Sequence, residues 1–422
     1  MTNLRIIWAS ASIAAMVSLV ACGGGGESGG TTDTNTRTTS GPITSFGSIY
    51  VNGQEIETNS ADIYIEDEAA DESDLRVGMM VHVEHDGNGN AYRIHHDDDL
   101  EGIVMANNIA AGQTTGAMDI MGQTITVNED TIFESYVAGI TDAGLVVAGN
   151  IVEVSGHSTG TGMITATRME VKAANLNDYL SSHAEGIEFE GVVANHSAAD
   201  STFDIGNMPI NYAGATLDDL PNGVDNGMYV EVKSRVELNA GVLMAYRVER
   251  EHDDYAEYHG DEDDEHEIHG MVMEVTADTI TVDSQLVIIN DQTEFEDGVR
   301  ADIVVGAMVE VEGYFNADGD LVADEIEIED QEATSEMYGE VGSVDAPEPN
   351  VGTITMMNGT MVHVNAETIM HDDRDEGMTP DDNFNLQDLA ANDYVEMYVY
   401  SNGDGTYTAT KIEREDAPVS TP

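Results

Sequence analysis

The chain has one cysteine, Cys22, among 422 residues, and only 14 lysine and arginine residues against 82 aspartate and glutamate residues. A lone cysteine excludes an internal disulfide, so the fold must rely on its packed core. The net charge of −68 repels phosphate backbones and anionic lipid headgroups, because both are bound through cationic side chains. We therefore expect cations, and no nucleic acid, among the partners of this protein.

Long apolar runs are also missing after residue 21, so we expect no membrane-spanning helix there. The one long run, Ile6 to Ala21, follows Arg5 and is shorter than the roughly 20 residues that a spanning helix needs. These features are typical of a secretory signal peptide, which we assign to residues 1–21. The run ends in Leu19-Val20-Ala21-Cys22, which resembles the lipobox of bacterial lipoproteins. The resemblance implies export and lipidation of Cys22.

The segment 22–40 is rich in glycine, serine and threonine, and we interpret it as a lipidated cysteine followed by a flexible tether. Gly23, rather than an aspartate, follows the cysteine. By resemblance to lipoprotein sorting, this favours the outer membrane as the site of anchoring. The N-terminal lipid is then the expected membrane contact.

Motifs of common enzymes are absent: the sequence has no Walker loop, no dinucleotide fingerprint and no stripe of alternating aromatic and basic residues. Gly156-His157-Ser158-Thr159-Gly160 matches the G-x-S-x-G elbow of hydrolases. That motif needs a strand before it and a helix after it, whereas both flanks here read as strands. We therefore expect a protein that is not an enzyme, with no catalytic residues. A hydrolase is the less favoured alternative.

Two sequence marks recur five times after Gly41. The first is a turn residue followed by alternating valine and acid, centred on Val81, Val152, Val230, Val309 and Val395. The second follows 10 to 15 residues later and reads Ala91-Tyr92-Arg93-Ile94-His95, Ala166-Thr167-Arg168-Met169-Glu170, Ala245-Tyr246-Arg247-Val248-Glu249, Ala323-Asp324-Glu325-Ile326-Glu327 and Ala409-Thr410-Lys411-Ile412-Glu413. Five ordered recurrences predict five tandem units.

Each unit has the period-two alternation of strands with one buried and one wet face. About five short strands in 60–85 residues favour a small closed barrel, because closure removes sheet edges. The predicted fold is therefore all-β, a tandem array of about five OB-like or SH3-like barrels. The expected repeats are 41–97, 100–175, 188–251, 268–331 and 337–416, with an acidic, histidine-rich linker at 252–267.

The first unit also resembles a known family. Thr44-Ser45-Phe46-Gly47-Ser48-Ile49-Tyr50-Val51-Asn52-Gly53, with Asp71 to Met79 downstream, is similar to a bacterial repeat domain of unknown function. That domain occurs in lipoproteins and other exported proteins. The resemblance implies exported β-barrel repeats and carries no catalytic residues. The other four units match it only in outline.

Histidines and acids supply the candidate metal ligands. Imidazole and carboxylate groups suit zinc or copper, and carboxylates alone suit calcium. The candidates form two clusters in the sequence: His82, His85, His95, His96, Asp97 and Asp98, and then His252, His259, His266 and His269. A solvated, salt-adapted acidic surface is the simpler interpretation of the charge.

Asn316-Ala317-Asp318-Gly319-Asp320 resembles part of a calcium loop. The glutamate that should complete the loop falls in an expected strand, so a turn explains the segment more simply.

These features favour a non-catalytic, lipid-anchored envelope protein that binds or scaffolds a partner outside the cytoplasm, such as another envelope protein or a polysaccharide. Capture of divalent cations by the acidic and histidine clusters is the alternative.

Overall fold

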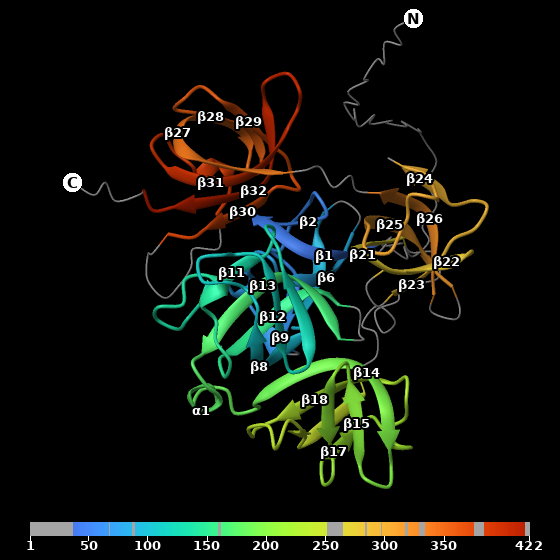
Figure 1. Cartoon of the computed structure of the whole chain (residues 1–422). Helices are drawn as coiled ribbons and strands as arrows, with labels where there is room; N and C mark the ends of the chain where they lie inside the picture. The colour runs from blue at the N-terminus through green and yellow to red at the C-terminus, as the bar shows by residue number, and fades with distance from the viewer. Residues whose placement is uncertain are drawn as a thin grey trace, which may run out of the picture. The chain divides into compact units, whose positions relative to one another are not determined.

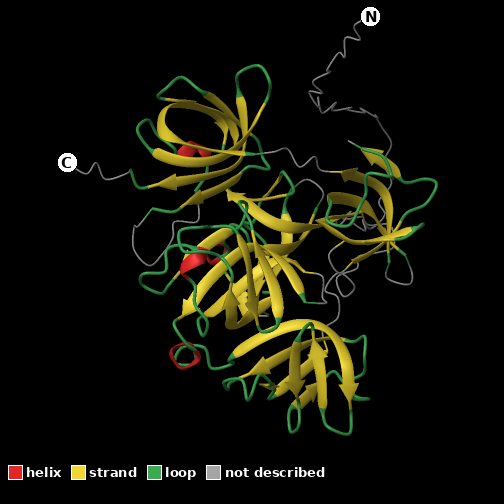
Figure 2. Ribbon diagram, in the orientation of Figure 1, coloured by secondary structure: helices red, strands yellow, loops and turns green. Residues whose placement is uncertain are grey.

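The computed structural model describes residues 37–66, 68–86, 89–158, 162–250, 265–282, 285–296, 298–316, 320–328, 334–374 and 384–417. Strands make up 57% of the described residues and helices 4% (Figures 1 and 2). The expected signal peptide, Cys22, His252 and His259 lie outside the described residues.

The second unit, barrel 2, shows the topology most completely. Its strands are β8 (Leu100–Asn107), β9 (Gly116–Ile120), β10 (Gln123–Val127), β11 (Ile132–Ser135), β12 (Ile151–Ser158) and β13 (Met163–Ala173). β8, β9 and β10 form an antiparallel meander, and β10 then pairs in parallel with β13. β13 pairs antiparallel with β12, and β12 closes the barrel on β8. This is the strand order of an OB barrel, with β11 added beside β13.

The other four barrels repeat this plan. Barrel 1 comprises β1 (Arg37–Phe46), β2 (Ile49–Val51), β3 (Gln54–Ile56), β4 (Asp62–Ile65), β5 (Glu68–Ala70), β6 (Met80–His85) and β7 (Ala91–His96). Barrel 3 comprises β14 (Ile187–Ser197), β15 (Thr202–Ile205), β16 (Met208–Asn211), β17 (Thr216–Asp218), β18 (Tyr229–Ser234), β19 (Leu243–Met244) and β20 (Arg247–Arg250).

Barrel 4 comprises β21 (Glu265–Val275), β22 (Thr279–Val282), β23 (Gln285–Ile288), β24 (Glu294–Glu296), β25 (Met308–Phe315) and β26 (Leu321–Ile328). Barrel 5 comprises β27 (Ser335–Glu348), β28 (Val351–Met356), β29 (Met361–Val364), β30 (Ile369–Asp372), β31 (Tyr394–Ser401) and β32 (Tyr407–Glu415). The predicted all-β array of five OB-like barrels is confirmed, and barrels 2, 4 and 5 close completely.

Short helical turns occupy the connections: η1 (Glu72–Asp74), η2 (Ala143–Leu145), α1 (Leu176–Tyr179) and η3 (Leu386–Asp388). None of the helices in the described part of the chain is long and apolar enough to cross a membrane.

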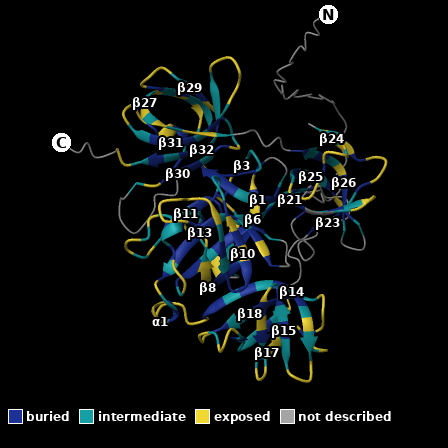
Figure 3. Cartoon of the chain, in the orientation of Figure 1, coloured by how far each residue is buried: buried dark blue, intermediate teal, exposed yellow. Residues whose placement is uncertain are grey.

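The period-two pattern explains which side of each strand faces the core. In β25, Val309 and Val311 are fully buried, whereas Glu310 and Glu312 between them face outward. Buried and half-buried positions also alternate along β6 and β31, and Figure 3 shows the buried stretches of the strands. The barrel cores consist mainly of valine, isoleucine and leucine. Burial of these side chains supplies the main driving force for folding each unit.

A left-handed turn residue explains the first sequence mark. Four glycines and one asparagine precede the valine-rich strand at equivalent positions and have φ values between 77° and 96°: Gly78, Gly149, Gly227, Gly306 and Asn392. Glycine, and less readily asparagine, adopts this conformation without a large steric cost. Each backbone N–H donates to a carbonyl on the first strand of its own barrel, at 2.8–2.9 Å. The mark therefore fixes how each barrel closes.

Two expected boundaries need correction. The tether was expected to reach residue 40, but β1 begins at Arg37 and pairs with both β6 and β21. The acidic linker was expected to reach residue 267, but β21 begins at Glu265. The parallel pairing of Arg37–Ser40 with Glu265–Ile268 joins barrels 1 and 4 through a shared ladder. Hydrogen bonding between two segments far apart in sequence orders both, which local composition does not reveal.

Candidate functional site: a carboxylate ladder on barrel 4

Four neighbouring strands of barrel 4 present acidic side chains on their outward face. One row across β21, β25, β26 and β24 consists of Glu267, Glu312, Glu325 and Glu294, and the next row consists of His269, Glu310, Glu327 and Glu296. We call these eight residues the outer ladder. Like charges directly opposite each other on paired strands are destabilising. Seven glutamates in two adjacent rows therefore form an arrangement that a bound cation would stabilise.

In the other four barrels, the equivalent rows include a positively charged side chain. The third residue of the second sequence mark is Arg93, Arg168, Arg247 or Lys411 in four barrels, and it is Glu325 in barrel 4. Each of the four cations contacts a nearby glutamate, with pairs to Glu84 at 3.1 Å, Glu134 at 2.7 Å, Glu249 at 2.5 Å and Glu413 at 3.0 Å. Barrel 4 therefore keeps the acids of the repeat and replaces its cation by a further acid.

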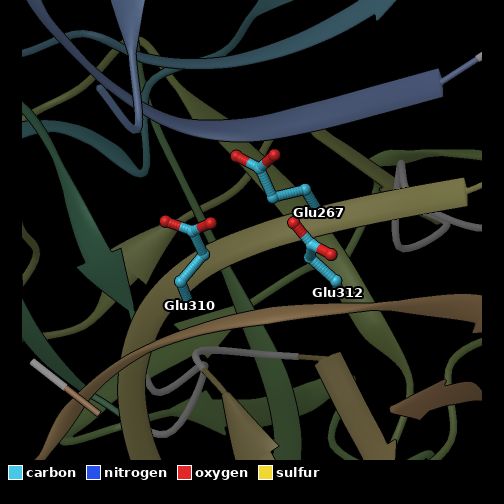
Figure 4. Close-up of side chains that lie close together, drawn as sticks. All are labelled: Glu267, Glu310 and Glu312. Carbon is cyan, nitrogen blue, oxygen red and sulfur yellow. The ribbon is translucent and has the colours of Figure 1, made fainter. Parts of the chain in front are cut away.

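Three members of the ladder converge most closely. Glu267, Glu310 and Glu312 each offer a carboxylate oxygen, and these three oxygens lie within 4.8 Å of one another. Figure 4 shows the three side chains together on one side of β21 and β25. All three are half-buried, and the Asn52 side-chain amide donates to Glu267 at 2.9 Å. In the part of the chain that the structure describes, this is the one group of three or more histidine, cysteine or acidic side chains placed closely enough to hold a metal ion.

The surroundings of the ladder raise the pKa of three of its glutamates above the ordinary value. Burial, reinforced by the charge of Glu267, raises the pKa of Glu310 to about 8. Burial likewise raises the pKa of Glu267 to about 6, although the hydrogen bond from Asn52 opposes this shift. A hydrogen bond with Glu296 raises the pKa of Glu325 to about 7. A divalent cation would compete with these protons, because it stabilises the ionised carboxylates.

The comparisons with known proteins address the repeat rather than this ladder. A family model described as "Domain of unknown function (DUF5666)" matches five stretches of the chain: residues 40–94, 101–170, 190–249, 269–327 and 338–413. The chain belongs to this family. The resemblance recognised in the first unit therefore extends to all five DUF5666 repeats.

Two further comparisons add little. No curated protein matches. The solved structure "drosophila Unr CSD456" is 12% identical, with 55% of this chain and 98% of that chain covered and a TM-score of 0.13. A likeness this slight carries no argument about the function of the DUF5666 repeats.

The first histidine cluster lies on β6, on β7 and in the segment directly after β7, and its histidines have separate partners. His82 faces His95 across β6 and β7, but His82 contacts the Ser40 hydroxyl at 2.7 Å and His95 contacts Asp97 at 3.0 Å. His85 is buried against the Thr39 hydroxyl at 3.0 Å.

His96 is buried between the Met80 carbonyl, at 2.7 Å, and Asp98, at 3.4 Å. Burial opposes protonation of its ring, but the hydrogen bond and charge of Asp98 raise its pKa above the usual value. Asp98 also accepts from the Ser155 hydroxyl at 2.8 Å, and thus contributes to the connection between the first two repeats.

The described members of the second cluster are also apart. His266 is buried, contacts the Thr38 hydroxyl at 2.5 Å and packs edge-on against Phe315. His269 belongs to the outer ladder and lies 5.8 Å from the His157 ring, centroid to centroid. Three consecutive hydroxyls, of Thr38, Thr39 and Ser40, thus each contact a different histidine. This pattern explains how β1 is held against its neighbours.

The remaining sequence candidates are turn and strand residues. Gly156, His157 and Ser158 lie within β12, paired along β13, so the strand-turn-helix geometry of a hydrolase elbow is not present at these residues. Asp320 donates its backbone N–H to the Asn316 side chain at 3.1 Å, as expected for a tight turn. The intervening residues 317–319 lie outside the described part of the chain.

The converging glutamates were not among the sequence candidates. Glu310 and Glu312 were recognised only as the outward positions of a strand, and Glu267 was assigned to a linker. The available signal was the second mark itself, in which Glu325 replaces an arginine or lysine. Aligning the repeats by that residue would have singled out barrel 4.

Proposed function

We propose that this chain is a non-catalytic, exported lipoprotein whose five DUF5666 barrels act outside the cytoplasm as a binding and scaffolding array. The observation that carries the proposal is the fivefold repetition of one small barrel, joined by strand pairing between barrels 1 and 4. Repeated modules present one type of surface several times, which suits attachment to an extended or repetitive partner. The lipobox-like segment before Cys22 supports anchoring through an N-terminal lipid, with the outer membrane as the favoured site.

Fractionation of cells that express the chain or its Cys22→Ser variant tests this proposal. We expect the unchanged chain in the membrane fraction and the variant in the soluble envelope fraction, with the same thermal unfolding curve for both. Retention of the variant in the membrane would contradict lipid anchoring. Turnover of ester or peptide substrates by the purified chain, lost on Ser158→Ala, would favour the hydrolase alternative instead.

The outer ladder favours a second candidate function, the binding of a divalent cation by barrel 4. Three carboxylates converge there, and Glu325 occupies the position of the cation found in the other four barrels. Carboxylate oxygens without sulfur ligands suit calcium or manganese better than copper. His269, in the adjacent row, supplies a nitrogen that zinc would use.

Calorimetry with calcium, manganese and zinc at constant ionic strength tests this candidate. We expect saturable binding that is lost in the Glu310→Gln/Glu312→Gln variant. It should persist in a Glu68→Gln/Glu237→Gln variant, which replaces the same number of glutamates at exposed positions elsewhere. Binding near pH 7 should release protons, because Glu310 is protonated there. Equal weakening in both variants would show that cations respond only to the net charge.

A further inference from the structure

The outward face of β27 and β31 in barrel 5 alternates tyrosines with glutamates. On β27 the outward residues are Glu336, Tyr338 and Glu340, and on β31 they are Tyr394, Glu396 and Tyr398. In the register, each tyrosine lies opposite a glutamate: Tyr338 with Glu396, Tyr394 with Glu340, and Tyr398 with Glu336. Aromatic rings and carboxylates therefore alternate along both strands and across them.

Part of this face is exposed to solvent. Tyr338 is 50% exposed, and Glu336 and Glu340 beside it on β27 are exposed as well. The Tyr338 hydroxyl donates to Glu336, the next outward residue on the same strand. Tyr398, in contrast, is hydrogen-bonded to Thr114, so it marks the edge of the open area.

The cation nearest in register to these strands is directed elsewhere. Lys411 lies opposite Tyr398 on β32, but its ammonium group donates to the carbonyls of Glu129 and Thr131 at 3.1 and 3.0 Å. It also pairs with Glu413 at 3.0 Å and is almost fully buried. Lys411 is therefore committed to partners outside β27 and β31.

We propose that the outer face of β27 and β31 binds an extended basic segment of another protein, through lysine and arginine side chains laid over Tyr338 and Tyr394 and paired with Glu336 and Glu340. The inference rests on the proposed binding array and names the chemical class of its partner.

A basic, extended peptide matches this face in two respects, its charge and the spacing of its side chains. Ammonium and guanidinium groups are attracted both to the faces of tyrosine rings and to carboxylates. Outward residues on a strand recur at about 7 Å, which is also the spacing of side chains on one face of an extended peptide. A strongly acidic chain also attracts a basic segment over a longer range and speeds its encounter.

The test uses the full chain carrying Cys22→Ser and a fluorescent nonalysine peptide, with anisotropy measured at 150 mM salt. Loss of one exposed cation–π contact weakens binding by about two- to fivefold, so Tyr338→Ala/Tyr394→Ala should weaken it by about tenfold. Tyr338→Phe/Tyr394→Phe keeps both rings and should change the affinity by less than about twofold.

A matched charge control separates this face from the overall field. Glu336→Gln/Glu340→Gln should weaken binding at least as much as the alanine pair. Glu68→Gln/Glu237→Gln, at exposed positions on barrels 1 and 3, removes two charges from outside β27 and β31 and should have little effect, because salt screens charges that do not contact the peptide. Thermal unfolding curves that match the unchanged chain show that each variant is folded.

Two results would overturn the assignment. One is equal weakening by Glu336→Gln/Glu340→Gln and by Glu68→Gln/Glu237→Gln, which would indicate attraction without a site. The other is tyrosine-dependent binding of a neutral oligosaccharide in place of the peptide. In the second case, the array proposal would stand while this partner class would be wrong. If the unchanged chain is not retained in the membrane but the peptide still binds as expected, lipid anchoring would be wrong while the assignment of this face would stand.

Discussion

Glu325 lies directly opposite Glu312 across β25 and β26, at the position where the other four barrels carry an arginine or lysine. In barrel 2 the equivalent residue, Arg168, donates to Glu170 at 2.7 Å and to Glu134 at 2.7 Å. One substitution in the repeat thus converts a neutralised row of acids into an unneutralised one. The fold of barrel 4 is the same, but a negative charge stands where the other barrels have a positive one.

The first prediction is that Glu325→Arg stabilises the protein in the absence of divalent cations. The arginine would remove the repulsion with Glu312 and restore the pairing of the other barrels. A gain of about 0.5–1 kcal/mol is expected from such cross-strand and partly exposed pairs. Urea unfolding with and without calcium measures it. The variant should also lose any stabilisation by calcium, and a variant that kept that response would place the cation elsewhere.

The second prediction concerns Arg168, which is 2% exposed and also donates to the Val77 carbonyl at 2.9 Å. Arg168→Met should destabilise the protein by about 3–5 kcal/mol, because the buried carboxylates of Glu134 and Glu170 lose the Arg168 guanidinium and Glu170 keeps only Lys172. Arg93→Met changes the equivalent residue of barrel 1, whose side chain is 41% exposed, and should cost less than about 1 kcal/mol. Denaturant unfolding of both variants gives the comparison. Similar losses of unfolding free energy in the two variants would show that burial does not determine how much this arginine contributes to stability.

The third prediction is that stability falls as the pH rises from about 5 to 8. Burial raises the pKa of Glu101 and of Glu310 to about 8, and that of Glu396 and Glu415 to about 7. Between their ordinary and raised values, the folded chain binds more protons than the unfolded chain, so deprotonation favours unfolding.

A second group sets the acidic limit of this stability. Arg168 and Lys172 lower the pKa of Glu170 to about 2 against the effect of burial, so the stability that Glu170 contributes is lost as the pH falls below about 4. The melting temperature should therefore peak near pH 5. A melting temperature that rises steadily to pH 8 would show that the buried carboxyls ionise in the folded state without cost.

Much of the fold could be predicted because its signals are local. The turn residue at Gly306 and the alternation through Val309 and Val311 define one strand, and the fivefold recurrence defines the unit. The pairing of β1 with β21 was not predictable in this way. Residues 38–40 have the composition of a linker, and they are ordered by hydroxyl contacts to histidines located elsewhere in the sequence.

The candidate site was harder to predict for a related reason. The histidines within each cluster are close in sequence, but period two sends neighbours to opposite faces. Each of the four rings of the first cluster has its own partner. The converging glutamates come from β21 and β25, which are about 40 residues apart and adjacent only through their register. The substitution at Glu325 was visible in the sequence, but its meaning depends on knowing which residue lies opposite.

The last prediction separates two costs at the turn before the valine-rich strand. Gly306 has a φ of 91° and open space where a Cβ would lie, so Gly306→Ala should cost only the left-handed strain, about 1 kcal/mol. Gly78 has a φ of 88°, but its Cβ would lie 2.7 Å from the Thr167 carbonyl oxygen, so Gly78→Ala should cost clearly more. Gly306→Asn should be milder than Gly306→Ala, because Asn392 already occupies this position in barrel 5 with a φ of 77°. Thermal unfolding of the three variants decides the order, and equal losses for both alanine variants would mean that the contact at Gly78 relaxes freely.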